Sequence, residues 1–334
     1  MMSLRRLTKN SIIAAPIHNV TASYFSTQNP TSAIHTPAHY DHLINVAGRK
    51  GDFAAVGRLL TERQSHGCLN TSNTFKFISI NISALDDLLQ NLAALGDDWF
   101  ARKNAHDALV AQLAKLCRTD EALRVVEIMA AKHYGVTATT FHPILNALAH
   151  SKEMPAAWRV VERMRACGVK PDLMSLNYIL TAYCVDGDVA SAAKTVTKME
   201  AYGMVADAIT YDALVLGACK AGKVEAGVAV VRRMVGEGLA PLFSSHVHII
   251  KEMVRRRCCA PAVEYVRIFA GKNEKLDAEN FGYLVRRLRN GKRIEEAKAV
   301  VEEMVTRGLP IDGLFKDLSP VNCNVVNHVN ETQD

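Results

Sequence analysis

A 35-residue repeat is the feature that most limits what this chain of 334 residues can fold into. When units are started at residues 103, 138, 173, 208, 243 and 278, the same kinds of residue recur in the same columns. The fourth place is a large residue, the seventh is Leu or Ile, the twentieth is Ala or Gly, and the twenty-seventh is Met in five units and Phe in one. Such a period is typical of solenoids, in which each unit must stack on its neighbours to bury its apolar face.

Each unit has the pattern of two helices joined by a turn. The first helix carries apolar residues at helical spacing, as in Tyr211, Leu214 and Val215. The second carries a Val pair followed by Met. A Gly and a Pro, such as Gly168 and Pro171, then end the unit, because Gly caps a helix and Pro prevents its continuation. We therefore predict an all-α solenoid of about eight helix-turn-helix units.

The repeat register also divides the chain into segments. Six regular units are predicted at 103–137, 138–172, 173–207, 208–242, 243–277 and 278–312. Two degenerate units precede them at 37–71 and 72–102, and the second of these is only 31 residues long. Residues 313 to 334 are expected to be a disordered tail.

Residues 1 to 36 have the composition of a transit peptide and linker. No acidic residue precedes Asp41, while three basic residues and nine Ser or Thr residues lie in the first 32 positions. This bias is typical of organelle targeting segments. It predicts the mitochondrial matrix as the location, with a plastid as the less favoured alternative and an untargeted tail as the third.

Composition excludes several classes of function. No run of 18 uncharged apolar residues is present, so no membrane partner is expected. The eight cysteines form no CxxC pair, so they predict reduced thiols and no metal site. The sequence has no Gly-rich phosphate loop, GxSxG motif or nuclease-type carboxylate cluster, so we expect neither a cofactor nor an enzyme.

Two stretches, LNYILTAYCVDGDVASAAKTVTKMEAYGMVAD and ITYDALVLGACKAGKVEAGVAVVRRMVGEGLAP, resemble pentatricopeptide repeats of the plain P-class found in plant organelles. The tetratricopeptide repeat is a poorer match, because its period is 34 and its Trp-Leu-Gly-Tyr signature is missing here. The resemblance implies a right-handed superhelical α-solenoid. It also implies binding of single-stranded RNA at one base per repeat, read by two or three side chains.

The resemblance further implies which places contact RNA. In the family, the fifth and last residues of a unit read the base edge, and the second residues of adjacent units sandwich the base. Asn177 and Asp207 hold the reading places of unit 173–207, a combination that implies uracil, and Met174 and Ile209 would sandwich that base. The alternative is that Asn177 is a solvated helix residue and Asp207 a helix N-cap.

Other units match the family less well. Their reading pairs would be His142 with Asp172, Asp212 with Leu242, Asp107 with Thr137, Val247 with Asp277, and Gly282 with Asp312. None of these is a standard combination in the family. Their second-place residues are polar, namely Asn104, Thr139, Ser244 and Glu279. Of these units, those with His142, Asp172 and Asp212 supply the further candidates for base reading.

Positive charge is concentrated near the C-terminal end. Residues 251 to 293 contain 12 basic and 5 acidic residues, within a whole-chain net charge of +6. Lys115, Lys220 and Arg255 share the thirteenth place of their units, where the family contacts phosphate. The alternative is an ordinary solvated helix face.

Three functions are compatible with this pattern. The first is an RNA-binding adaptor in mitochondrial RNA processing, stability, splicing or translation, with a single-stranded transcript as its partner. The second is a structural component of a large ribonucleoprotein such as the mitochondrial ribosome, packed on rRNA, ribosomal proteins or other ribonucleoprotein components. The third is a protein-binding scaffold without RNA.

Overall fold

The computed structural model describes residues 36 to 79, 82 to 95 and 99 to 318, and these hold fifteen α-helices and no strand. This confirms the expected all-α solenoid. The six regular units are the hairpins α4 (Trp99–Lys115) with α5 (Thr119–Ala131), α6 (Ala138–His150) with α7 (Met154–Ala166), α8 (Leu173–Asp186) with α9 (Val189–Ala201), α10 (Ala208–Lys220) with α11 (Val224–Gly236), α12 (Phe243–Arg255) with α13 (Cys259–Phe269), and α14 (Glu274–Asn290) with α15 (Ile294–Thr306).

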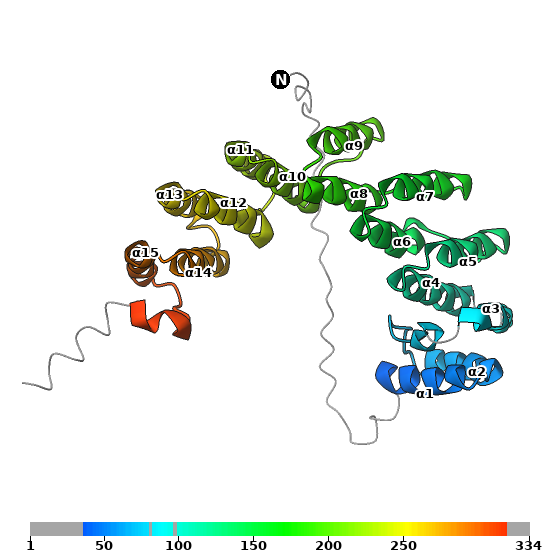
Figure 1. Ribbon diagram of the computed structural model, residues 1–334. Helices are drawn as coiled ribbons and strands as arrows, with labels where there is room; N and C mark the ends of the chain where they lie inside the picture. Colours follow the sequence, from blue (N-terminus) through cyan, green and yellow to red (C-terminus); the bar gives the residue numbers. More distant parts are fainter. Residues whose placement is uncertain (1–35, 80–81, 96–98, 319–334) are drawn as a thin grey trace, which may run out of the picture.

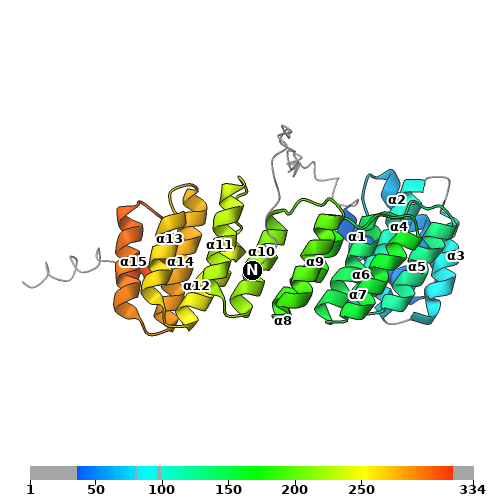
Figure 2. The ribbon, with the colours of Figure 1, turned by 90° about the horizontal axis from the view of Figure 1, so that it is seen from above.

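The hairpins stack into an arc with an inner and an outer layer. Figure 1 shows α4, α6, α8, α10, α12 and α14 along the concave side, with the second helix of each hairpin outside them. Seen from above in Figure 2, the helices stand side by side, so the turns within hairpins follow one edge of the arc. The first turn of every inner helix therefore lies near the opposite edge.

The repeat columns supply the core. In unit 138–172, Phe141, Ile144, Ala157 and Met164 are all fully buried. The buried apolar residues of the described chain form two clusters. The first ends at Ala213 and the second begins at Val215, and both residues belong to α10. Helix α10 therefore contributes to both clusters and joins them.

The turns between paired helices use left-handed backbone at one fixed place. The fifteenth residue of every regular unit has a φ between 57° and 75°. Only units 173–207 and 208–242 have the Gly that this conformation favours, while the other four have Cys117, Lys152, Arg257 and Lys292. These four side chains occupy a backbone conformation that is sterically disfavoured for them.

The second degenerate unit differs from the expected helix pair. The first degenerate unit is a normal hairpin of α1 (Pro37–Arg49) and α2 (Phe53–Ser65), but unit 72–102 has only the 3-10 turns η2 (Lys76–Ser79) and η3 (Ile82–Ala84) where its first helix was expected. Its second helix is α3 (Leu85–Ala93), and α4 already begins at Trp99, inside the predicted unit.

Side chains of the first hairpin hold this irregular segment. Asn45 donates through Nδ2 to the carbonyl of Asn73 at 2.8 Å and accepts from the backbone N–H of Phe77 at 2.7 Å. The Arg63 guanidinium, only 1% exposed, lies 2.7 Å from Asp41 Oδ1. The two Asn45 bonds satisfy backbone groups that a helix would have paired internally, so the segment packs without one.

The C-terminal end also differs from expectation at its start. Residues Gly313–Leu318 form the 3-10 helix η4, and its Phe315 and Leu318 are buried against the last hairpin. Of the predicted tail, 313 to 318 therefore cover the end of the core, and 319 to 334 lie outside the described residues, as does the predicted transit peptide up to residue 35. No described helix is both long and apolar enough to span a bilayer.

Candidate nucleic-acid interface

Two of the predicted reading residues cap inner helices. Asp172 precedes α8 and accepts a hydrogen bond from the backbone N–H of Ser175 at 2.9 Å. Asp207 precedes α10 and accepts from the backbone N–H of Thr210 at 2.8 Å. The capping role considered for Asp207 is therefore present, and it fixes each carboxylate at the start of an inner helix.

Asn177 and Asp207 are in direct contact, as their pairing requires. Asn177 donates through Nδ2 to Asp207 Oδ1 at 3.2 Å, and Asn177 Oδ1 lies 2.8 Å from the hydroxyl of Thr210. Asn177 is 1% exposed, so it is not the solvated helix residue of the alternative interpretation. A primary amide has two donor hydrogens and two acceptor lone pairs, so one of each remains for a ligand.

A cavity of about 280 Å³ adjoins this amide. Met174, Asn177 and Ile209 all line it, so three of the four residues predicted for one base lie around the same space. Asp207 does not line the cavity, but it positions Asn177, which does, by accepting a hydrogen bond from its amide. Other lining residues come from α6 and the rest of α8, and they include Asn146, His150, Lys152, Tyr178, Thr181 and Val185.

His142 and Asp172 also form a pair. His142 Nε2 lies 2.9 and 3.1 Å from the two carboxylate oxygens of Asp172, which also accepts from the Ser175 hydroxyl at 2.7 Å. Although burial raises the pKa of the Asp172 carboxyl, the hydrogen bonds from Ser175 and His142 outweigh burial and lower that pKa below its ordinary value. Tyr178 lies edge-on to the imidazole, with ring centroids 5.8 Å apart.

Asp212 is fixed by side chains of the next inner helix. Its Oδ1 accepts from the hydroxyls of Ser244 at 2.9 Å and Ser245 at 2.6 Å, and Oδ2 lies 3.9 Å from His248 Nε2. Burial raises the pKa of Asp212, but bonds from His248 and the two serines lower it further than burial raises it. Leu242, the last-place residue of the same unit, precedes α12 and makes no side-chain capping bond, so it does not fix Asp212 as Asp207 fixes Asn177.

The contacts share a rule that sequence reasoning missed. The fifth-place side chain of one unit bonds to the third-place hydroxyl of the next in three units. These bonds are Asp107 with Thr140 at 2.8 Å, Asn177 with Thr210 at 2.8 Å, and Asp212 with Ser245 at 2.6 Å. The third place is a small polar residue in five successive units, namely Thr140, Ser175, Thr210, Ser245 and Asn280. This recurrence is the sequence feature from which the bonds between units could have been predicted.

The rule fails at the C-terminal units. Val247 has no polar atom to offer Asn280, whose buried Oδ1 has no partner among the described residues. Asp277, the last-place residue of the unit that contains Val247, lies inside α14 and accepts from the backbone N–H of Gly271 at 2.7 Å. In the last unit, the fifth place is Gly282, which lies next to the Phe315 ring of η4 rather than a reading partner.

The predicted phosphate contacts lie at the ends of inner helices. Lys115 and Lys220 are exposed, and no ion pair to either is present among the described residues. Arg255 is also exposed, but its Nε and Nη2 donate to both carboxylate oxygens of Glu252 at 2.7 and 2.6 Å. Hydrogen bonding by Arg255, opposed by burial and helped by Arg256, lowers the pKa of Glu252 to about 2. The charge of Arg255 is therefore already compensated.

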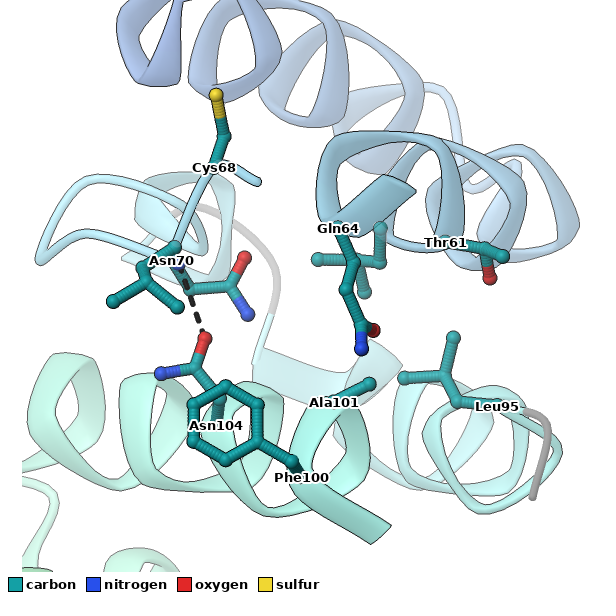
Figure 3. Close-up of a pocket in the computed structure, with 10 residues that line it drawn as sticks. Thr61, Gln64, Cys68, Asn70, Leu95, Phe100, Ala101 and Asn104 are labelled. Atoms are coloured by element: carbon teal, nitrogen blue, oxygen red, sulfur yellow. Dashed lines mark hydrogen bonds between the residues drawn. The ribbon is translucent and has the colours of Figure 1, made fainter. Parts of the chain in front are cut away.

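A second, smaller cavity of about 80 Å³ lies beside the irregular unit (Figure 3). It is lined by parts of α2 and α4, and Figure 3 shows Gln64, Asn70 and Asn104 around it with Phe100 at its side. Asn104 Oδ1 accepts from the backbone N–H of Asn70 at 3.1 Å. The second-place Asn104 therefore anchors a loop.

Comparison with known proteins places these features in a family. The model of a pentatricopeptide repeat-containing protein matches residues 92 to 199, and the model of the PPR repeat matches residues 209 to 239. One curated mitochondrial pentatricopeptide repeat-containing protein of Arabidopsis thaliana is 42% identical over 333 residues, covering 96% of this chain and 95% of the relative. A second from the same plant is 54% identical over 309 residues, covering 91% and 88%.

Among solved structures, the pentatricopeptide repeat protein PPR10 in complex with an 18-nt psaJ RNA element is 18% identical, with a TM-score of 0.48 over 84% of this chain and 40% of that one. The 35-residue register, the stacked hairpins and the two relatives that match almost the full length agree with one another. This chain belongs to the pentatricopeptide repeat family.

Proposed function

We propose that this chain is a mitochondrial RNA-binding protein that holds single-stranded RNA along its concave face and recognises uracil at unit 173–207. The observation that carries the proposal is the Asn177 amide, which is fixed by Asp207 and Thr210 beside a cavity that Met174 and Ile209 also line. The location is supported by the mitochondrial names of the two relatives and by the acid-free start of the chain.

The donors and acceptors left on Asn177 complement uracil. The remaining Nδ2 hydrogen can donate to a uracil carbonyl, and the remaining lone pair of Oδ1 can accept from the ring N–H beside it. Met174 and the 39% exposed Ile209 provide apolar surface for the two faces of the ring. Cytosine in the same orientation would place an unprotonated ring nitrogen opposite the Oδ1 lone pair, so it would bind more weakly.

In the cell, the protein would act by occupying its RNA during processing, stabilisation, splicing or translation. Uracil reading at one unit contributes limited selectivity, because one such contact contributes about 1–3 kcal/mol. His142 with Asp172 gives the neighbouring unit 138–172 a second fixed polar group. Recognition is therefore expected to centre on these two adjacent units.

The test is binding of short oligouridine and oligocytidine to the full-length chain, measured by fluorescence anisotropy. Asn177→Ala should weaken oligouridine binding by roughly tenfold and remove the preference over oligocytidine. Val247→Ala, a truncation at the same place of a unit without an amide, serves as the matched control and should change neither. Equal binding of both oligonucleotides by the unmodified chain would exclude uracil reading.

A structural role in a large ribonucleoprotein is the second candidate, and one observation favours it. Asp107 and Asp212 put carboxylates, already bonded to neighbouring hydroxyls, in two of the six fifth places. These groups are poor general readers of bases and repel phosphate. Co-sedimentation of the tagged chain with a ribosomal subunit at high salt would support this role, whereas crosslinking to one transcript region away from ribosomes would support the adaptor.

A further inference from the structure

The turns inside the last two regular hairpins combine strained backbone with positive charge. Arg257 and Lys292 hold the fifteenth place of their units, with φ values of 62° and 58°. Glycine fills the same place in units 173–207 and 208–242. A residue kept in a disfavoured conformation, where related units use glycine, points to a role for its side chain.

Neither of these two charges is neutralised within the part of the chain that the structure describes. Arg257 and Lys292 are exposed, and no ion pair to either is found there. Lys152 differs, because at the same place of unit 138–172 it forms an ion pair with Asp186 at 2.6 Å. The strained cations at the C-terminal end are therefore available to an external anion.

Further cations border the same turns. Lys220 and Lys223 lie exposed at the turn of the preceding hairpin, and Arg256 donates to the Gly222 carbonyl, which ties two successive turns together. In Figure 2 the turns within α10 and α11, α12 and α13, and α14 and α15 follow one edge of the arc. We call the exposed side chains Lys220, Lys223, Arg257 and Lys292 the cationic turn edge.

The fifth-place residues of the last two units cannot read bases. Their fifth places are Val247 and Gly282, and neither side chain can hydrogen bond to a base edge. RNA that runs past Asn177 toward these units therefore meets charge without reading groups. Phosphate is the RNA group that such a surface recognises, independently of sequence.

We propose that the cationic turn edge binds the phosphate backbone of a base-paired RNA segment adjacent to the single strand in the groove. This rests on the proposed RNA-binding function. Base-paired RNA fits because its base edges are already occupied, and a surface of exposed cations on the rim of the arc contacts only its backbone. The edge would position a stem next to the strand that Asn177 reads.

Glycine substitution makes a clean test, because it removes the charge and relieves the backbone at once. The double variant Arg257→Gly with Lys292→Gly is compared with Cys117→Gly, which makes the same backbone change without removing a charge. Thermal unfolding should be unchanged or raised in both proteins. Weaker RNA binding by the double variant then cannot be caused by unfolding.

Binding of full-length protein is measured for a short oligouridine and for the same strand followed by a hairpin stem. The unmodified chain should bind the stem-tailed RNA more tightly, and the double variant should lose that advantage while its affinity for the plain strand changes by less than about twofold. The slope of log Kobs against log salt for stem-tailed RNA should fall by about 2, corresponding to two lost phosphate contacts.

Unchanged affinity and slope in the double variant would overturn the inference. Unchanged RNA binding combined with lost binding to polyglutamate would overturn it in favour of an acidic protein partner. Failure of the proposed function looks different, because the unmodified chain would then not prefer oligouridine, whatever the stem adds.

Discussion

The hydroxyl of Thr210 should contribute more to stability than its small size suggests. Thr210 is 1% exposed, and its Oγ1 lies 2.8 Å from Asn177 Oδ1 and 2.8 Å from Asp207 Oδ1. Thr210→Val keeps the shape and removes the donor, which leaves the buried oxygen of Asn177 without a partner. An unsatisfied buried acceptor costs about 1–3 kcal/mol, and loss of the reciprocal helix cap adds a few tenths, so we expect about 2 kcal/mol.

A double-mutant cycle isolates this bond. Asn177→Leu with Thr210→Val replaces both polar partners by apolar groups. The free energy of unfolding of this double variant is expected to differ little from that of either single variant. Thr140→Val is the matched control, because its partner Asp107 also pairs with Lys103 and keeps that contact. The control should therefore cost less than about 1 kcal/mol.

The assay is urea unfolding followed by circular dichroism, with hydrogen exchange of the α8 and α10 amides to locate the change. Exchange matters here because a repeat array can lose local structure before it unfolds globally. A coupling energy between Asn177 and Thr210 below about 0.3 kcal/mol, which is the level of independent sites, would refute the claim that the hydroxyl fixes the amide. Reduced uracil preference in Thr210→Val would link the bond to recognition.

Three further changes test the packing of the array. Val247→Thr should stabilise the chain by about 1 kcal/mol in urea unfolding, because it offers a hydroxyl to the unpaired buried Oδ1 of Asn280. A loss of stability would show that residue 247 does not reach Asn280. Burial lowers the pKa of His246 to about 4, below its unfolded value near 6.5. The free energy of unfolding should therefore be unaffected above pH 6.5 and fall as the pH drops toward 4. His246→Phe should reduce this pH dependence, and an unchanged dependence would contradict the assignment to His246. Gly217→Ala would put its Cβ 2.8 Å from Cys184 Sγ and should lower the free energy of unfolding by about 1–3 kcal/mol. Adding Cys184→Ala should restore part of this loss. If thermal unfolding shows no such rescue, the clash lies elsewhere.

The fold was predictable where the signals are local. Small residues at the twentieth place, glycines at turns and Met at the twenty-seventh place recur at short range, so hairpins and their register follow from the sequence. The irregular segment after α2 was not predictable in the same way. It depends on Asn45 and Arg63, whose partners in that segment lie 6 to 32 residues away, and no periodicity identifies such bonds.

The candidate site was predictable in one unit for a similar reason. Asn177 and Asp207 are in contact because Asp207 caps α10 and the helix start sets its position. Asp212 is held instead by Ser245 of the next helix, because the last-place residue of its own unit has an apolar side chain and offers no hydrogen bond. Phosphate contact by Arg255 stays a prediction, but its pairing with Glu252, which lies one helical turn earlier, could have been predicted from the sequence.

The division of the buried apolar residues into two clusters that meet at α10 has a mechanical consequence. A chain with two cores joined at one helix is expected to open there first, so α10 acts as the boundary between two cooperative units of folding. Asn177 lies on α8, which belongs to the first cluster. Its partners Asp207 and Thr210 lie at the start of α10, the helix that connects the two clusters. A base seated beside Asn177 would contact α8 and Ile209 at the start of α10, so RNA binding should strengthen the attachment of α10 to the first cluster.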